Sequence, residues 1–98
     1  MKVGLINEKQ VTKLLSKFEL EELDLFIDEL KKGLISGKRL TYEFFKEKKI
    51  GGKKVYFLIY HDICIILFVG SSDKKLQQET IDAIKGSFKE FKKIAKGY

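Results

Sequence analysis

The sequence predicts an α+β domain in which an N-terminal helical hairpin packs on one face of a small antiparallel sheet. Three observations predict it. Two apolar runs of strand length are joined by the short turn His61-Asp62, apolar residues recur at helical spacing on either side of these runs, and proline is absent. With 98 residues the chain has room for one core, so we expect residues 1–98 to form a single domain of order β-α-α-β-β-β-α.

The N-terminal third predicts a short strand and two helices. Residues 2–6 are the strand, and Asn7 follows as an N-cap, with Gln10 placed to complete a capping box. A second helix is expected over residues 19–32, because acids occupy its first turns, lysines its last turn, and Gly33 supplies the stop. Only a tight joint separates the two helices, which predicts an antiparallel helical hairpin.

Three strands are predicted in the middle of the chain. Residues 40–50 alternate loosely and are rich in Tyr and Phe, and residues 53–60 and 63–69 are the next two strands. Gly51-Gly52 supplies a two-residue hairpin turn between the first two strands. Cys64 lies inside the last apolar run, where we expect a small buried residue.

Alternation along residues 53–60 separates an apolar face, which should meet the helices, from a mixed face. The mixed face is expected to stay partly open, and it carries Lys54, Tyr56, Leu58 and Tyr60. In the preceding strand Lys46 and Lys48 share one side, and we expect them to converge with Lys54 and Tyr56. The alternative is that these lysines blunt a sheet edge or extend into solvent.

The C-terminal segment, residues 73–96, predicts a helix with one buried stripe. Ser72 or Asp73 is placed to cap its start, and Gly97 marks its end. Gly86 lies in the middle, where glycine costs roughly 0.5–1 kcal/mol relative to alanine. The helix is therefore expected to bend or end at Gly86.

Positive charge is concentrated in two segments of the chain. The net charge is +6, with seven Lys or Arg against two Glu in residues 36–56 and seven Lys against three acids in residues 74–98. Such a concentration is typical of a surface that binds a polyanion, and RNA is the leading candidate ligand. The alternative is a lysine-rich surface adapted to heat, in which Lys and Glu are both enriched.

Several kinds of site and location are excluded by the residues present. One cysteine and one histidine cannot build a zinc site, and no carboxylate pair, Ser-His-Asp set or phosphate-binding glycine loop is visible, so no metal or cofactor is expected. The longest apolar run is far short of the ~20 residues that a membrane helix needs. No signal peptide is apparent, and we expect a cytoplasmic protein.

Catalysis by positive charge remains available to such a chain. Lysines can stabilise the charge that develops on a phosphate while a ribose 2′-hydroxyl attacks its own 3′ phosphate, a cleavage of RNA that needs no metal. Exposed tyrosines would add base stacking, worth ~1–3 kcal/mol for each base. This hypothesis requires Lys48, Lys54 and Lys74 to meet on one exposed side of the sheet.

Two stretches carry a resemblance to a known family. KKVYFLIY, with the order of elements, resembles the RelE/ParE toxin superfamily, and IILFVGSSDKKLQQETIDAIK is similar to the end of HigB-like and archaeal RelE-like toxins. The resemblance covers residues 36–85, and the N-terminal hairpin in pattern only. It implies a RelE-like toxin of a type II toxin–antitoxin system, an mRNA interferase that cleaves message on the ribosome and inhibits translation. The implied partners are a cognate antitoxin protein, the ribosome and mRNA; the oligomeric state stays open.

The same resemblance implies positions for the site. The strand arginine of the family falls at Lys54, and the basic residue after the last strand falls at Lys74 or Lys75. A basic position of the preceding strand matches Lys46 or Lys48, and a C-terminal tyrosine matches Tyr98. The expected catalytic residues are Lys48, Lys54, Lys74 and Tyr98, and the expected nucleic-acid contacts are Arg39, Lys46, Lys53, Lys75, Tyr56 and Tyr60.

Lysine in place of the family's strand arginine leaves two alternatives open, because lysine does not hold a phosphate bidentately. One is a non-catalytic module with a RelE-like fold that binds nucleic acid or a protein. The other is a ParE-like inhibitor of a topoisomerase, since the fold alone does not choose the target.

Overall fold

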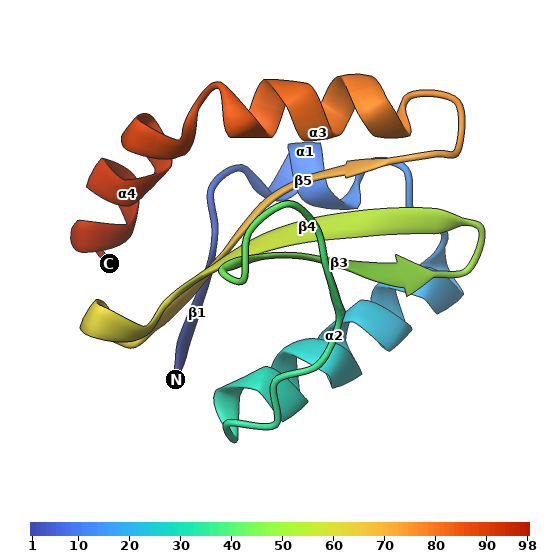
Figure 1. Cartoon of the computed structure of the whole chain (residues 1–98). Helices are drawn as coiled ribbons and strands as arrows, with labels where there is room; N and C mark the ends of the chain where they lie inside the picture. Colours follow the sequence, from blue (N-terminus) through green and yellow to red (C-terminus); the bar gives the residue numbers. More distant parts are fainter.

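The computed structural model describes residues 1–98 as an α+β fold with a five-stranded mixed sheet and four α-helices (Figure 1). The strands are β1 (Lys2–Leu5), β2 (Lys38–Arg39), β3 (Phe45–Ile50), β4 (Lys53–Tyr60) and β5 (Ile65–Ser72); the helices are α1 (Glu8–Thr12), α2 (Lys17–Lys31), α3 (Gln77–Lys85) and α4 (Phe88–Lys96). The sheet order is β1-β5-β4-β3-β2. The α+β class is confirmed, but the sheet is not wholly antiparallel, because β1 pairs in parallel with β5.

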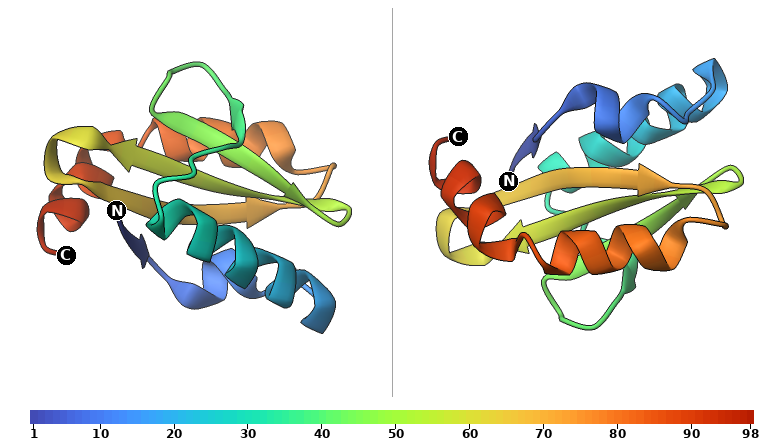
Figure 2. Two further views of the ribbon diagram at one scale, coloured as in Figure 1. Left: turned by 90° about the horizontal axis from the view of Figure 1, so that it is seen from below. Right: turned by 90° about the horizontal axis from the view of Figure 1, so that it is seen from above.

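Helices cover both faces of the sheet, as the views from below and above in Figure 2 show. One core joins α1 and α2 to the sheet through Val11, Leu15, Leu23, Phe26, Leu30, Ile50, Val55, Phe57, Ile59, Ile66 and Phe68. The second core joins α3 and α4 to the other face through Phe45, Tyr56, Leu58, Tyr60, Ile65, Leu67, Val69, Ile81, Ile84 and Ala95. The expectation of a partly open face was therefore wrong. Residues 65–69 are apolar at every position, which is typical of a strand buried on both sides.

The N-terminal helices are unequal in length. Asn7 caps α1 as expected, accepting a hydrogen bond from the Lys9 N–H at 3.1 Å, but α1 is a single turn. The longer helix α2 begins two residues before its predicted start, because Ser16 and Glu19 form a reciprocal capping box. The predicted antiparallel helical hairpin is therefore not confirmed: its first helix is a single turn that packs on β5, and its second packs on β1 and β3.

Two further predicted elements are divided in the structure. Residues 40–44 form a loop between β2 and β3 rather than the start of a strand. The C-terminal segment forms two helices that separate at Gly86 and Ser87, as the glycine predicted. Asp73, not Ser72, takes part in the start of α3: its Oδ1 accepts a hydrogen bond from the Leu76 N–H at 3.1 Å.

The connection between β4 and β5 corrects one prediction. It is a 3₁₀ turn at His61–Ile63, followed by Cys64 in the left-handed region at φ 55°. Cys64 was expected to be buried in a strand, but it is exposed because it belongs to this connection. None of the helices is both long and apolar enough to span a lipid bilayer.

Candidate phosphate-binding cleft

Four lysines meet at the tip of the β3–β4 hairpin, beside the first turn of α3. They line a cleft of about 370 Å³ that contains no apolar side chain, and we call it the lysine cleft. Its lining residues are Lys49, Gly51, Gly52, Lys53, Lys54, Lys74 and Gln77.

The hairpin turn and the end of β5 bring these lysines together. The two-residue turn pairs Ile50 with Lys53, and so places Lys49 directly opposite Lys54 on one face. Gly51 has φ +60°, a left-handed conformation that favours glycine, and a Cβ there would displace the Glu19 carboxylate. On the other side of β4, Lys54 pairs with Ser72, the last residue of β5. The chain therefore leaves the sheet beside Lys54, and Lys74, two residues further on, lies at the cleft.

Two of the four lysines are held by carboxylates. Lys53 Nζ lies 2.7 Å from Glu19 Oε1, and Lys54 Nζ lies 2.9 Å from Glu47 Oε1. The hydrogen bond from Lys53, with that from the Ser16 backbone, lowers the pKa of Glu19 to about 2. Glu47 is 3% exposed, and its Oε2 is buried without a hydrogen-bond partner. The Lys54–Glu47 pair lies on the same face as Lys49, whereas Lys53 pairs with Ile50 on the α2 face, where Glu19 holds its ammonium group.

The other two lysines, Lys49 and Lys74, are exposed and form no ion pair. Placing Lys49 opposite Lys54 on one sheet face is unfavourable by itself, since like charges directly across a pair of strands repel. An anion between them would relieve that repulsion. Gln77 adds an uncharged amide to the lining, and the positive end of α3 is already met by the Asp73 carboxylate, which accepts a hydrogen bond from the Leu76 N–H.

The structure brings some of the predicted lysines together and separates others. Lys53, Lys54 and Lys74 line the cleft, and Lys75 is exposed next to Lys74 without lining it. Lys48 lies on the opposite face, where its Nζ is 5.0 Å from the ring centroid of Phe26. The expected convergence of Lys48 with Lys54 is therefore wrong.

Strand register explains this separation. Lys46 is paired with Phe57, and Lys48 with Val55, so both lysines share the face that α2 covers. The residue that joins Lys54 is Lys49, which our sequence interpretation missed. A signal for it was present, because a two-residue turn at Gly51-Gly52 already implies the pairing of Lys49 with Lys54.

The expected tyrosines do not reach the cleft. Tyr56 is fully buried, its hydroxyl is 2.8 Å from Ser72 Oγ, and burial raises its pKa. Tyr60 is 8% exposed beneath Lys92, and burial, followed by the charge of Asp62, raises its pKa to about 12. Neither side chain offers a free ring for base stacking.

Tyr98 and Arg39 also lie outside the cleft lining. The Tyr98 hydroxyl donates a hydrogen bond to the Leu5 carbonyl at 2.9 Å, and Arg39 pairs with Glu43 at 2.8 Å. One exposed tyrosine that the sequence interpretation missed is Tyr42, which is 46% exposed and stacks on Phe44 with ring centroids 5.3 Å apart.

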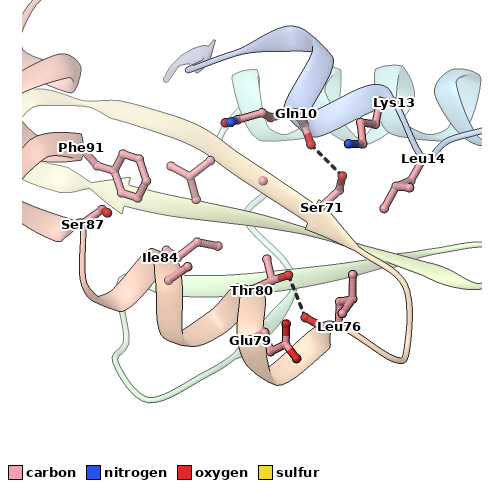
Figure 3. Close-up of a pocket in the computed structure, with 13 residues that line it drawn as sticks. Gln10, Lys13, Leu14, Ser71, Leu76, Glu79, Thr80, Ile84, Ser87 and Phe91 are labelled. Carbon is pink, nitrogen blue, oxygen red and sulfur yellow. Dashed lines mark hydrogen bonds between the residues drawn. The ribbon is translucent and has the colours of Figure 1, made fainter.

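A groove of about 430 Å³ lies between α1 and α3, over the end of β5 (Figure 3). Apolar side chains such as Leu14, Ile84 and Phe91 line it, and Lys13 and Glu79 are its charged residues. Its polar contacts are internal, as in the hydrogen bond from Ser71 Oγ to the Gln10 carbonyl at 2.9 Å. The groove therefore has no excess charge with which to hold an anion.

Comparisons of the chain with models of protein families, with curated proteins and with solved structures found no match. The chemistry of the lysine cleft is accordingly the basis for a functional hypothesis.

Proposed function

We propose that this chain binds phosphate groups of RNA in the lysine cleft. The observation that carries this proposal is the pair Lys49 and Lys74, two exposed ammonium groups without carboxylate partners in a cleft that already contains Lys53 and Lys54. Repulsion among these groups is a cost that a bound polyanion would offset.

We further propose that RNA binding serves a RelE/ParE-like toxin of a type II toxin–antitoxin pair. The resemblance of KKVYFLIY and of the segment that follows β5 supports this assignment, and both segments supply lysines to the cleft. The proposed activity is ribosome-dependent, metal-independent cleavage of mRNA, with a cognate antitoxin as the neutralising partner. Lys54 and Lys74 would stabilise charge on the phosphate under attack.

A non-catalytic RNA-binding module is the second candidate, and the lining of the cleft favours it. None of the lining residues is a His, Asp, Glu or Tyr that could transfer a proton. Cleavage would thus depend on charge stabilisation and on groups that the ribosome or the RNA supplies.

Binding to single-stranded RNA, measured by filter binding between 50 and 200 mM salt, tests the first proposal. The double variant Lys49→Gln/Lys74→Gln should lose affinity, and its slope of log K against log salt should shrink by about 1.4, since two phosphate contacts are removed. The matched control is Lys89→Gln/Lys93→Gln, which removes two exposed lysines of α4. Equal losses in the two variants would show diffuse binding and overturn the assignment to the cleft.

Expression of the gene alone separates the two candidates. Arrest of growth together with ribosome-dependent cuts in message supports the interferase, and Lys54→Ala should greatly reduce those cuts. Normal growth and intact message, with RNA binding retained, supports the non-catalytic module instead.

A further inference from the structure

The charge in the lysine cleft indicates which kind of phosphate fits it. Glu19 neutralises Lys53 and Glu47 neutralises Lys54, which leaves a charge of about +2 from Lys49 and Lys74. A phosphodiester inside a nucleic-acid strand carries one negative charge. A phosphate monoester at a strand end carries ≈ −1.5 to −2 at pH 7, because its second pKa is ≈ 6. The monoester is the better electrostatic match.

The surroundings of the cleft give a second reason to expect the end of an RNA strand rather than an internal nucleotide. No apolar or aromatic side chain lines the cleft, so nothing within it would hold the base of an internal nucleotide. Helix α3 leads away from the cleft and carries the exposed carboxylate of Asp82. This carboxylate would repel a phosphate chain that continued along α3.

We infer that the lysine cleft binds the terminal phosphate monoester of an RNA strand in preference to an internal phosphodiester. This inference rests on the first part of the proposed function, RNA binding by the cleft, and it favours the non-catalytic module, because an endonuclease has to hold an internal phosphodiester. Lys49 and Lys74 are the groups that contact the phosphate, while Lys53 and Lys54, tied to their carboxylates, are positioning residues that shape the hairpin side of the cleft.

The test compares three forms of one ten-nucleotide RNA with an internal fluorophore, carrying a 5′-phosphate, a 3′-phosphate, or hydroxyl groups at both ends. Fluorescence anisotropy at pH 7.5 should show that one phosphorylated form binds tighter than the hydroxyl form by on the order of tenfold, as expected for charge-assisted hydrogen bonds. Which form binds tighter identifies the strand end. Inorganic phosphate at millimolar concentration should compete only with that form.

Two features would mark the preference as electrostatic recognition of a dianion. It should weaken as the pH falls from 7.5 to 5, because the monoester then takes up a proton. It should also disappear in Lys49→Gln and in Lys74→Gln, while Lys89→Gln/Lys93→Gln keeps it. If Lys49 or Lys74 had only a structural role, replacing it with Gln would lower the affinity for all three RNAs alike.

The outcomes distinguish this inference from the function on which it rests. Equal affinity of the wild-type protein for the three RNAs, with cleft variants weaker toward all of them, would overturn the terminal-phosphate inference and leave RNA binding in place. Absence of binding to any RNA would overturn the proposed function itself. The comparison among the three RNAs needs no variant, so it does not depend on how the variants fold.

Discussion

The lysine cleft and the groove between α1 and α3 lie on either side of the start of α3, yet their chemistry is opposite. Leu76 lines the groove, and the next residue, Gln77, lines the cleft. The groove combines apolar side chains with one lysine and one glutamate, whereas the cleft contains four lysines and no apolar side chain. Two hollows of similar size thus differ in the ligand that each could hold, and charge rather than volume makes the difference.

The two hollows also have different physical origins. The groove follows from a short strand: β1 pairs with β5 only over Ile65–Phe68, which leaves the end of β5 uncovered between α1 and α3. Its formation brings no like charges together. The cleft assembles like charges, and it persists because Glu47 neutralises Lys54 and Glu19 holds the Lys53 ammonium group on the α2 face. A feature that opposes folding and is retained is a better candidate for a functional site than an unfilled hollow.

The largest effect is expected from Glu47→Gln, which removes a negative charge from beneath the cleft without changing the shape of the side chain. The free energy of unfolding should fall by ~1–3 kcal/mol, because Lys54 loses a charge-assisted hydrogen bond in a mostly buried position. RNA affinity should nevertheless rise, and the salt slope should steepen by about 0.7. Urea denaturation and filter binding measure the two effects.

Glu79→Gln is the control, since it makes the same charge change in the groove. Glu79 is exposed and forms no ion pair, so stability should change by less than ~0.5 kcal/mol. An increase in RNA affinity as large as that of Glu47→Gln would remove the distinction between the cleft and the groove.

A smaller effect is expected from acidification, which protonates Glu19 and so removes its ion pair with Lys53 at the tip of the β3–β4 hairpin. The pKa of Glu19 is lowered from 4.5 to about 2, so its ionised form favours the folded state at every pH above 4.5. That stabilisation should be lost as the pH falls from 4.5 toward 2. Urea denaturation across this pH range measures the free energy of unfolding of the wild type and of Glu19→Gln. The difference between the two should be greatest at the higher pH.

Glu21→Gln serves as the comparison for the acid series, because the Glu21 side chain is exposed on α2 and forms no ion pair. Its stability should follow that of the wild type as the pH falls. A Glu19→Gln variant with the same pH dependence as the wild type would show that the ion pair with Lys53 does not hold the tip.

The smallest effect is expected from filling the groove. Ala83→Leu adds apolar volume on α3 at an exposed position that lines the groove, and leucine is a good helix former. RNA affinity should stay within twofold of the wild type in the same filter-binding assay. A larger loss would place the groove within the RNA-binding surface and contradict the assignment to the cleft alone.

Local patterns predicted a substantial part of the fold. Strands β4 and β5, the turn at Gly51-Gly52, the Asn7 cap and the helix break at Gly86 all depend on residues close together in the chain. The same local rules were sufficient to pair Lys49 with Lys54, although we grouped Lys48 with Lys54 instead. That error came from assigning faces by alternation within each strand without counting across the turn.

The candidate site was less predictable, because its parts come from distant segments. Glu19 lies 34 residues before Lys53 along the chain, and nothing in either segment alone indicates that they meet. The burial of Tyr56 and Tyr60 likewise depends on where α3 and α4 pack. Alternation identifies residues that share a face, but it does not say which helix will cover that face.

The sequence by itself thus determined the elements, the hairpin at Gly51-Gly52 and the excess of lysine around it, since propensity, turn chemistry and charge are local properties. Tertiary structure alone decided that β1 joins β5 in parallel, that Lys74 comes beside Lys54, and that carboxylates neutralise Lys53 and Lys54 but not Lys49 and Lys74. The physical reason is that the charge of a cleft is set by all segments packed around it, and contacts between remote segments form only when the whole core assembles.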